Sequence, residues 1–235
     1  MLQIKDIKLT QFKNYNCRNF EFTRRIVCIC GNNGTGKTSL LDAIHYLCFT
    51  KSYFIRSDSN SAHQGQNGFR IEGKFFLNGK EEKALCILRE PGKKEFSVNG
   101  DTYEKFSQHI GHYPCVIIAP DDAQLITGGS EERRKFLDAL LSQLDAEYLK
   151  SLITYNKILQ QRNALLRSFA ESGINDFSVM DILDKQLIEP GSFIFNARKK
   201  FLTRFFPMVI RLYLEIAQQP EEIQYRSRTK YPPDG

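Results

Sequence analysis

The sequence predicts an α/β protein in which a strand-rich lobe is followed by a helical lobe. Near the N-terminus, apolar residues fall mostly at every second position, as in half-buried strands. A glycine-rich turn then separates a continuous apolar run from a helical pattern, and beyond residue 130 the apolar residues recur at helical spacing. We therefore expect two domains, formed by residues 1–129 and residues 130–235.

The composition is that of an ordinary globular protein. Of the 235 residues, 41% are hydrophobic and 26% are charged, and the formal net charge of +6 is compatible with a phosphate-rich partner without requiring one. No stretch approaches the roughly 20 consecutive apolar residues of a membrane span, and residues 1–6 lack the apolar core of a signal peptide. We expect a cytoplasmic protein without a membrane partner.

The strand-rich lobe begins with two alternating runs, residues 2–12 and 17–22, each of which predicts a strand. The continuous apolar run of residues 26–30 predicts a central strand covered on both faces. Residues 37–49 predict a helix, because their large aliphatic side chains fall on one side, and the polar residues 51–68 predict a loop.

Two β-hairpins are expected next, because two Asn-Gly pairs lie between apolar runs. Both residue types tolerate the positive φ of a type I′ turn. The turns are Asn78-Gly79, between residues 69–77 and 84–88, and Asn99-Gly100, between residues 96–98 and 102–103. A further short buried strand is expected over residues 115–119.

The cysteines all lie in the first half of the chain and form no C-x-x-C pair, so they do not indicate a zinc site. Most fall within apolar runs, which favours reduced residues buried in the core. They are Cys17, Cys28, Cys30, Cys48, Cys86 and Cys115.

The helical lobe is predicted from residue 130 to about residue 217. Pro190 and Pro207 predict kinks or breaks within it, because proline lacks the N–H group of a helical hydrogen bond. Residues 171–176 are expected to form a turn between two helices.

A phosphate-binding loop is the most specific motif in the sequence. Residues 31–38, Gly-Asn-Asn-Gly-Thr-Gly-Lys-Thr, match G-x-x-x-x-G-K-[ST] in full and lie between a predicted strand and a predicted helix. Glycines let successive backbone N–H groups surround phosphates at the positive end of that helix. Lys37 can reach the β- and γ-phosphates, and the Thr38 hydroxyl is placed to ligate magnesium. We predict that the chain binds ATP with Mg2+.

The loop alone does not define the reaction, and no catalytic residue is assigned. ATP hydrolysis also needs an acidic residue at the end of another strand, and Asp121 and Asp122 follow an apolar run. A proline intervenes, however, and either aspartate could instead cap a helix. The capping interpretation is favoured over the magnesium-binding one.

Four blocks of sequence carry a resemblance to a known family. They are residues 9–15, 31–44, 120–138 and 161–166. The first block is similar to L-x-x-F-R-N-Y, with Lys13 in place of the arginine, and the second is similar to N-G-x-G-K-T-x-x-L-E-A-I. In these blocks and their order the chain resembles the N-terminal part of the RecF family, bacterial recombination-mediator ATPases related to the heads of SMC and Rad50 proteins.

The resemblance implies an α/β P-loop NTPase fold of the ABC-type ATPase head. Such a head has a mixed sheet with N-terminal hairpins and an inserted helical lobe. The family's L-S-x-G-Q-like signature and acidic Walker B strand are not found in this sequence, so we expect a chain truncated at its C-terminus. We also expect it to bind ATP but to hydrolyse it very slowly.

The resemblance also implies a function in DNA replication, repair and recombination. Family members dimerise around ATP, bind single-stranded and gapped double-stranded DNA, and help load RecA together with RecR and RecO. For this chain it implies nucleotide contacts from Lys13 and Asn14, and DNA or inter-lobe contacts from Arg133 and Arg134. The implied nucleotide-binding residues of the loop are Gly31, Asn32, Asn33, Gly34, Thr35, Gly36, Lys37, Thr38 and Ser39, with Thr38 also on the metal.

Two alternatives stay open at the level of sequence. A P-loop kinase acting on a small molecule would need an arginine-rich lid, for which residues 162–167 are a candidate. A DNA-binding module that uses ATP without hydrolysing it would need no catalytic acid. The Asn33-Gly34 form of the loop and the two hairpins favour the ATPase head over the kinase.

Overall fold

The computed structural model describes residues 1–90, 92–172 and 178–217. The chain forms two compact units, Met1–Leu149 and Lys150–Gly235. The change of character expected at residue 130 coincides with the start of helix α3 (Ser130–Leu144), which belongs to the first unit. Each unit is described by itself.

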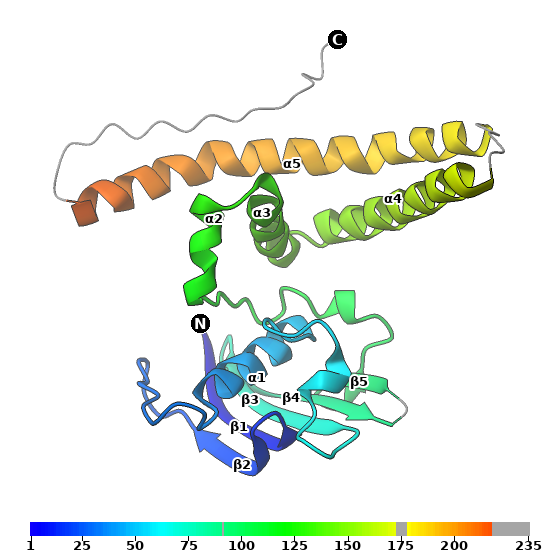
Figure 1. The fold of residues 1–235 in the computed structure, drawn as a ribbon. Coiled ribbons are helices and arrows are strands. Elements are labelled where there is room, and N and C mark those ends of the chain that lie inside the picture. Colours follow the sequence, from blue (N-terminus) through cyan, green and yellow to red (C-terminus); the bar gives the residue numbers. More distant parts are fainter. Residues whose placement is uncertain (91, 173–177, 218–235) are drawn as a thin grey trace. The chain divides into compact units, whose positions relative to one another are not determined.

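The first unit contains one six-stranded sheet with the order β2-β1-β3-β4-β5-β6 (Figure 1). Every pairing in it is antiparallel, so the mixed sheet expected from the sequence is not seen among the described residues. The strands are β1 (Leu2–Phe12), β2 (Tyr15–Glu21), β3 (Phe69–Leu77), β4 (Lys80–Arg89), β5 (Lys93–Val98) and β6 (Asp101–Thr102).

The two predicted hairpins are present as β3–β4 and β5–β6. Asn78 and Gly79 have φ angles of 49° and 88°, and Asn99 and Gly100 have φ angles of 53° and 95°. All four values lie in the region that a type I′ turn requires, which explains why Asn-Gly occurs at both positions.

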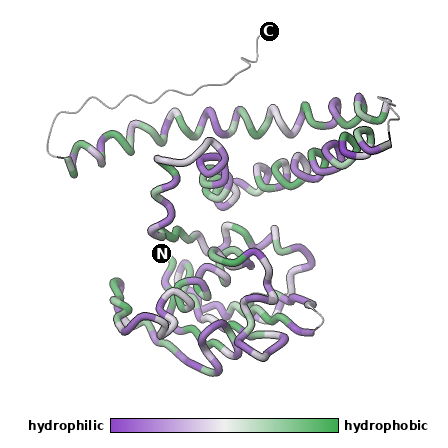
Figure 2. The backbone as a smooth tube through the Cα atoms, in the orientation of Figure 1, coloured by the Kyte–Doolittle hydropathy of each residue, from purple (hydrophilic) through white to green (hydrophobic). Residues whose placement is uncertain are grey.

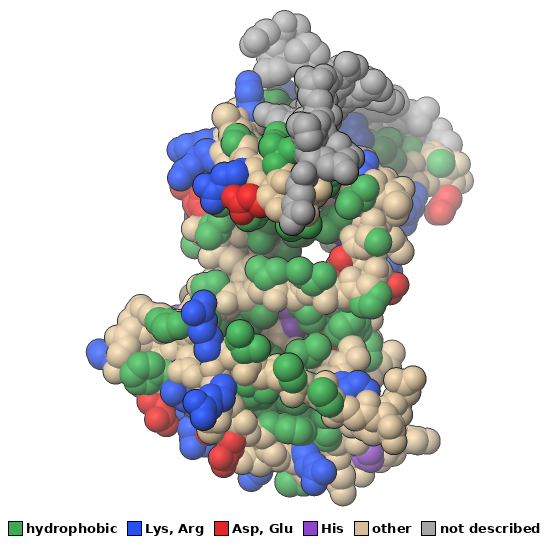
Figure 3. Space-filling view, turned by 90° about the vertical axis from the view of Figure 1, so that its left-hand side faces the viewer, with side chains coloured by type: hydrophobic (Ala, Val, Ile, Leu, Met, Phe, Trp, Pro, Cys, Tyr) green, Lys and Arg blue, Asp and Glu red, His purple; other side chains and the backbone are tan. Residues whose placement is uncertain are grey.

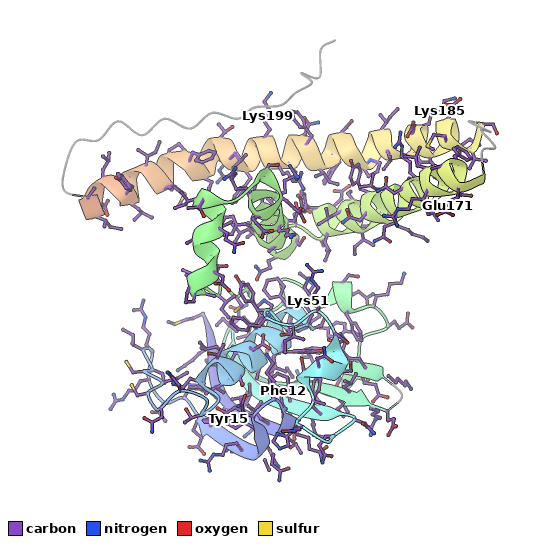
Figure 4. All side chains as sticks on the ribbon, viewed as in Figure 1. Phe12, Tyr15, Lys51, Glu171, Lys185 and Lys199 are labelled. Carbon is purple, nitrogen blue, oxygen red and sulfur yellow. The ribbon has the colours of Figure 1, made fainter. Side chains whose placement is uncertain are left out.

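One face of the sheet is apolar and is covered by helix α1 (Lys37–Phe49), whose bounds agree with the prediction. Phe12 has no exposed surface and makes edge-to-face contacts with Tyr46 of α1, at a centroid distance of 6.0 Å, and with Phe69, at 5.2 Å (Figure 4). The other face carries ion pairs such as Asp6–Lys74. The alternation along β1, β3, β4 and β5 therefore separates a core from a solvated face.

Two of the predicted strands are wrong. Residues 26–30 and 115–119 lie outside every described strand, and Ile26 and Ile118 are 82% and 85% exposed. An apolar run becomes a strand only where a neighbour completes its hydrogen bonds, and none of the described strands pairs with either segment. Hydrophobic side chains are visible on the surface of the face drawn in Figure 3.

The prediction of buried cysteines is also wrong in part. Cys28 and Cys30 are exposed because they lie in one of these unpaired segments, and Cys17 is exposed on β2, at the edge of the described sheet. Cys48 and Cys86 are buried as predicted, and burial raises the pKa of the Cys86 thiol to about 12. The remaining cysteine, Cys115, is half-buried.

Short helices lie in two of the connecting segments. The predicted loop of residues 51–68, between α1 and β3, contains the 3-10 helix η1 (Asp58–Ser61), and η2 (Phe106–Gln108) follows β6 on the way to α3. Next come η3 (Pro120–Ala123) and α2 (Gln124–Thr127).

The described part of the second unit is helical. It contains most of α4 (Ala146–Ser172) and all of α5 (Ser178–Ala217), along which apolar and polar residues alternate (Figure 2). Kinks or breaks were predicted at Pro190 and Pro207. The breaks are wrong, because α5 continues through both residues, and a kink at either one stays a prediction. A proline removes only its own N–H group and disturbs one carbonyl, and a helix of 40 residues tolerates this local loss.

The turn predicted at residues 171–176 falls largely on residues 173–177, outside the described residues. Among the described helices, none combines the length and the apolar character that crossing a bilayer requires.

A buried histidine links the sheet to α1. His109 has no exposed surface, and its Nε2 donates to the backbone oxygen of Leu47 at 2.8 Å. Its ring centroid lies 4.3 Å from that of Phe96 and 5.7 Å from that of His112, which in turn bonds to Glu82. Burial in this largely aromatic environment lowers the pKa of His109 to about 4.

This shift predicts that the protein loses stability as pH falls from 7.5 to 5. In that interval the unfolded state takes up a proton on residue 109 near pH 6.5, whereas folded His109 stays neutral down to about pH 4. Between these two pH values the difference amounts to about 2 kcal/mol of unfolding free energy, of the roughly 3 kcal/mol that the full shift represents. Urea unfolding at the two pH values, with wild type and His109→Asn, measures it. An equal pH dependence in the variant would contradict this assignment, since its amide can replace the bond to Leu47 without titrating.

Candidate phosphate-binding site

The glycine-rich loop lies directly before α1, and its backbone conformation depends on glycine. Gly31, Gly34 and Gly36 have φ angles of 151°, 82° and 95°, which residues with side chains rarely adopt. Gly36 is also the N-cap of α1, and no side chain caps it. The first N–H groups of the helix therefore remain available to an anion at the positive end of the helix dipole.

The ammonium group of Lys37 is held within the curve of this loop. Its Nζ donates to the backbone oxygen of Gly31 at 2.7 Å and to that of Asn32 at 2.8 Å. The Oγ1 of Thr35 donates to the same Asn32 oxygen at 2.9 Å. Thr38, in the first turn of α1, is exposed. One cation, a row of helix N–H groups and a free hydroxyl together fit a phosphate group and its metal ion.

Asn14, in the turn between β1 and β2, contacts the loop on both sides. Its Nδ2 donates to the backbone oxygen of Gly34 at 3.1 Å, and its Oδ1 accepts from the hydroxyl of Ser39 at 2.7 Å. The structure therefore brings together Asn14 and Ser39, which the sequence assigned separately to the site. A direct contact between either residue and a nucleotide stays a prediction.

Tyr15 is a neighbour of the loop that received no role from the sequence (Figure 4). Its hydroxyl donates to the backbone oxygen of Gly36 at 3.0 Å. A Cβ atom built on Gly36 would lie 2.8 Å from the Tyr15 ring, closer than van der Waals contact allows. Glycine is thus required at residue 36 for two reasons, its positive φ and the proximity of this ring.

Lys13 does not present a free cation. Its Nζ forms an ion pair with Oδ2 of Asp42 at 2.5 Å, and its side chain is only 12% exposed. The same Nζ lies 5.8 Å from the ring centroid of Phe12 and 5.5 Å from that of Phe54. A contact between Lys13 and a nucleotide stays a prediction, and the interaction that the structure gives it is with α1.

Asp42 is the residue of this region that sequence reasoning missed. It has no exposed surface, and besides Lys13 it accepts hydrogen bonds from Ser52 Oγ and from the backbone N–H of Tyr53, each at 2.7 Å. The available signal was a carboxylate on an otherwise apolar helix, since Asp42 lies between Leu41 and Ala43. Such a residue must have partners when it is buried.

Asp122 caps a helix, as the favoured interpretation of its sequence context predicted. Its Oδ2 accepts from the backbone N–H of Ala119 at 2.6 Å, at the start of η3. Its Oδ1 accepts from the hydroxyl of Tyr53. Burial, followed by this hydrogen bond, raises the pKa of Tyr53 to about 12. Asp121 beside it is exposed.

The two arginines that the sequence assigned to DNA or inter-lobe contacts lie exposed on α3. Arg133 donates from Nη1 to the backbone oxygens of Leu125 at 3.1 Å and Ile126 at 3.4 Å, at the end of α2. Arg134 donates from Nη1 to the hydroxyl of Ser130 at 2.9 Å. Arg133 therefore also connects α3 with α2, whereas the bond of Arg134 stays within α3.

Arg162, a residue of the segment considered as a kinase lid, is held in an ion pair within the second unit. Its Nε and Nη2 donate to the two carboxylate oxygens of Asp184 at 2.5 and 3.4 Å, linking α4 with α5. This pairing gives the arginine a structural partner, and no feature of the described residues favours the kinase alternative.

Comparisons with known proteins agree on one family. A family model described as an AAA domain matches residues 6–225. The DNA replication and repair protein RecF of Flavobacterium johnsoniae is 41% identical over 223 residues, covering 95% of this chain and 62% of that protein. RecF of Parabacteroides distasonis is 40% identical, covering 94% of this chain and 59% of that protein. The chain thus spans about three fifths of the length of these relatives.

Solved structures give the same result. The recombination mediator protein RecF in the RecFOR pathway, in its ATPrS form, matches with a TM-score of 0.87 and 30% identity, covering 92% of this chain and 58% of that one. The RecF-ATP structure matches with a TM-score of 0.85. These matches confirm the predicted fold class, an α/β ATPase head of the RecF type with a helical lobe. The chain belongs to the AAA domain family, and RecF proteins are among its relatives.

Proposed function

We propose that this chain binds ATP through residues 31–39 and acts in DNA replication and repair, as its relatives are named to do. The observation that carries the proposal is the position of the Lys37 ammonium group, held by two loop carbonyls beside the uncapped N-terminus of α1. That arrangement concentrates positive charge and N–H donors at one point, which suits a polyphosphate.

The roles of the loop residues follow from their positions. Backbone N–H groups of residues 34–38 would bind phosphate oxygens, Lys37 would neutralise the terminal phosphates, and Thr38 would hold Mg2+. Mg2+, when bound, supplies a second positive charge that bridges phosphate oxygens. The names of two solved relatives, RecF-ATP and RecF-ATPrS, support ATP as the nucleotide.

The wider function extends the same proposal. Because the chain spans about three fifths of its relatives, ATP-dependent dimerisation, recognition of gapped or single-stranded DNA, RecA loading and contacts with RecR and RecO are proposals for it. Slow hydrolysis also stays a prediction. It is supported by Asp122, whose two carboxylate oxygens accept bonds from Ala119 and Tyr53 and are thereby engaged.

ATP binding is tested first on wild type and Lys37→Ala with a fluorescent ATP analogue and Mg2+. We expect the variant to lose at least about tenfold in affinity, because a charged hydrogen-bonding partner of the phosphates contributes roughly 1.5–3 kcal/mol. Lys93→Ala is the matched control, since it removes the same charge from a side chain that is 74% exposed on β5. Equal affinity of wild type and Lys37→Ala would contradict the assignment.

The contact between Gly36 and Tyr15 gives a second test of the loop. Gly36→Ala should weaken ATP binding strongly, because the new methyl group would strike the Tyr15 ring and the φ of 95° would be strained. Gly34→Ala is the control for backbone strain alone, since nothing lies within 4 Å of its Cβ position. Adding Tyr15→Ala to Gly36→Ala should restore part of the affinity. Equal losses in the two alanine variants would show that the ring is unimportant.

DNA binding is tested with gapped DNA at two salt concentrations, with and without ATP. We expect ATP to strengthen binding by wild type but not by Lys37→Ala, and salt to weaken it. Arg134→Ala should reduce the slope of log affinity against log salt concentration by about one, because one phosphate contact is lost. An affinity that responds to neither salt nor ATP would contradict this part of the proposal.

A further inference from the structure

We infer that Asp42 positions the phosphate-binding loop indirectly, by holding the turn that carries Asn14. The inference rests on the proposed function, since ATP affinity is its readout. In this inference the buried carboxylate helps to keep the phosphate-binding loop in its conformation, and Lys13 contributes to this through its ion pair with Asp42.

The end of β1 and the turn between β1 and β2 have a backbone that needs support. Gln11, near the end of β1, and Lys13, in the turn, have φ angles of 54° and 48°, a region that residues with side chains rarely occupy. The backbone of Lys13 is bonded on both sides, because its N–H donates to Ser61 O at 2.9 Å and its oxygen accepts from Nδ1 of His63 at 2.6 Å. These bonds hold the start of the turn against the end of η1 and the segment that follows it.

The side chain of Lys13 supplies the remaining support. Its Nζ lies 2.5 Å from Oδ2 of Asp42, and the Asp42 side chain is fully buried. An ion pair that excludes water is screened little, and removing one partner leaves an uncompensated buried charge. Residue 13 therefore stays fixed to α1 as long as Asp42 carries its charge.

Asp42 is itself fixed on the side away from Lys13. Its Oδ1 accepts from the N–H of Tyr53, and its Oδ2 accepts from the hydroxyl of Ser52 as well as from Lys13. The same Ser52 oxygen accepts from the N–H groups of Phe54 and Ile55, at 3.1 and 3.0 Å. The carboxylate is thus oriented by the loop that follows α1, and its direction toward Lys13 is set.

The effect reaches the phosphate-binding loop through the next residue in the chain. Asn14 follows Lys13 directly, and its amide bonds to Gly34 on one side and Ser39 on the other. A rotation of the turn at Lys13 would move this amide away from both partners. The loop and the first turn of α1 would then no longer be bridged by the Asn14 side chain.

A merely structural ion pair would behave differently. Breaking such a pair would lower the stability of the unit, and ATP affinity would change only as far as the folded fraction changes. A positioning role instead predicts that affinity changes when the Lys13–Asp42 contact is broken, and that the change depends on Asn14.

The experiment measures ATP affinity and urea unfolding for a set of variants of the whole chain. Asp42→Asn keeps the shape of the side chain and an acceptor for Tyr53 but removes the charge, and Lys13→Met breaks the pair from the other side. We expect both to weaken ATP binding by about tenfold, the scale of coupling between contacting residues. Glu82→Gln is the matched control, because it neutralises another partly buried carboxylate, one that bonds to His112 and Tyr113 and not to the β1–β2 turn, and it should change affinity less than about twofold.

A double-mutant cycle then separates the two explanations. In the background of Asn14→Ala, Asp42→Asn should change ATP affinity by less than about twofold, because the residue through which it acts is already gone. Additive losses would overturn the inference, as would an affinity of Asp42→Asn equal to that of wild type or of Glu82→Gln. Absence of ATP binding by wild type would overturn the proposed function and this inference together, so the two failures are distinguishable.

Discussion

The burial of one carboxylate constrains how the first unit is built around its phosphate-binding loop. Asp42 has no exposed surface, and a buried charge without partners costs roughly 3–5 kcal/mol, a large part of the stability of a small domain. Its partners come from two segments distant in sequence, the β1–β2 turn with Lys13 and the loop after α1 with Ser52 and Tyr53. The unit must therefore bring these segments together on α1, and Tyr53 continues the connection to Asp122.

Local signals were sufficient for the parts of this unit that depend on neighbouring residues. The start of α1 follows from Gly36, whose φ of 95° ends the loop, and its apolar side chains fall on the face that covers the sheet. The hairpins follow from Asn-Gly pairs whose backbone angles suit few other residues. The phosphate-binding motif is likewise local, because its chemistry resides in consecutive backbone N–H groups and in Lys37.

Features that depend on distant partners could not be predicted in the same way. Residues 26–30 have the composition of a central strand, but strand formation depends on a neighbour that sequence alone does not identify. The exposure of Cys28 follows from the same missing pairing. Pro190 is a helix breaker by propensity, yet α5 continues through it, since packing routinely overrides propensity. The partners of Asp42 are 10 or more residues away and become visible only in the fold.

A lysine at residue 13 is compatible with the other hydrogen bonds that Asp42 accepts. The family block to which this turn is similar has arginine where this chain has Lys13. A guanidinium group bonds to both oxygens of a carboxylate in one plane, whereas an ammonium group acts as a point charge on one of them. Here Lys13 occupies Oδ2 and leaves Oδ1 to the N–H of Tyr53. Lysine is thus compatible with a carboxylate that must also hold the following loop, because it leaves Oδ1 to the N–H of Tyr53 alone, whereas a bidentate arginine would share that oxygen with it.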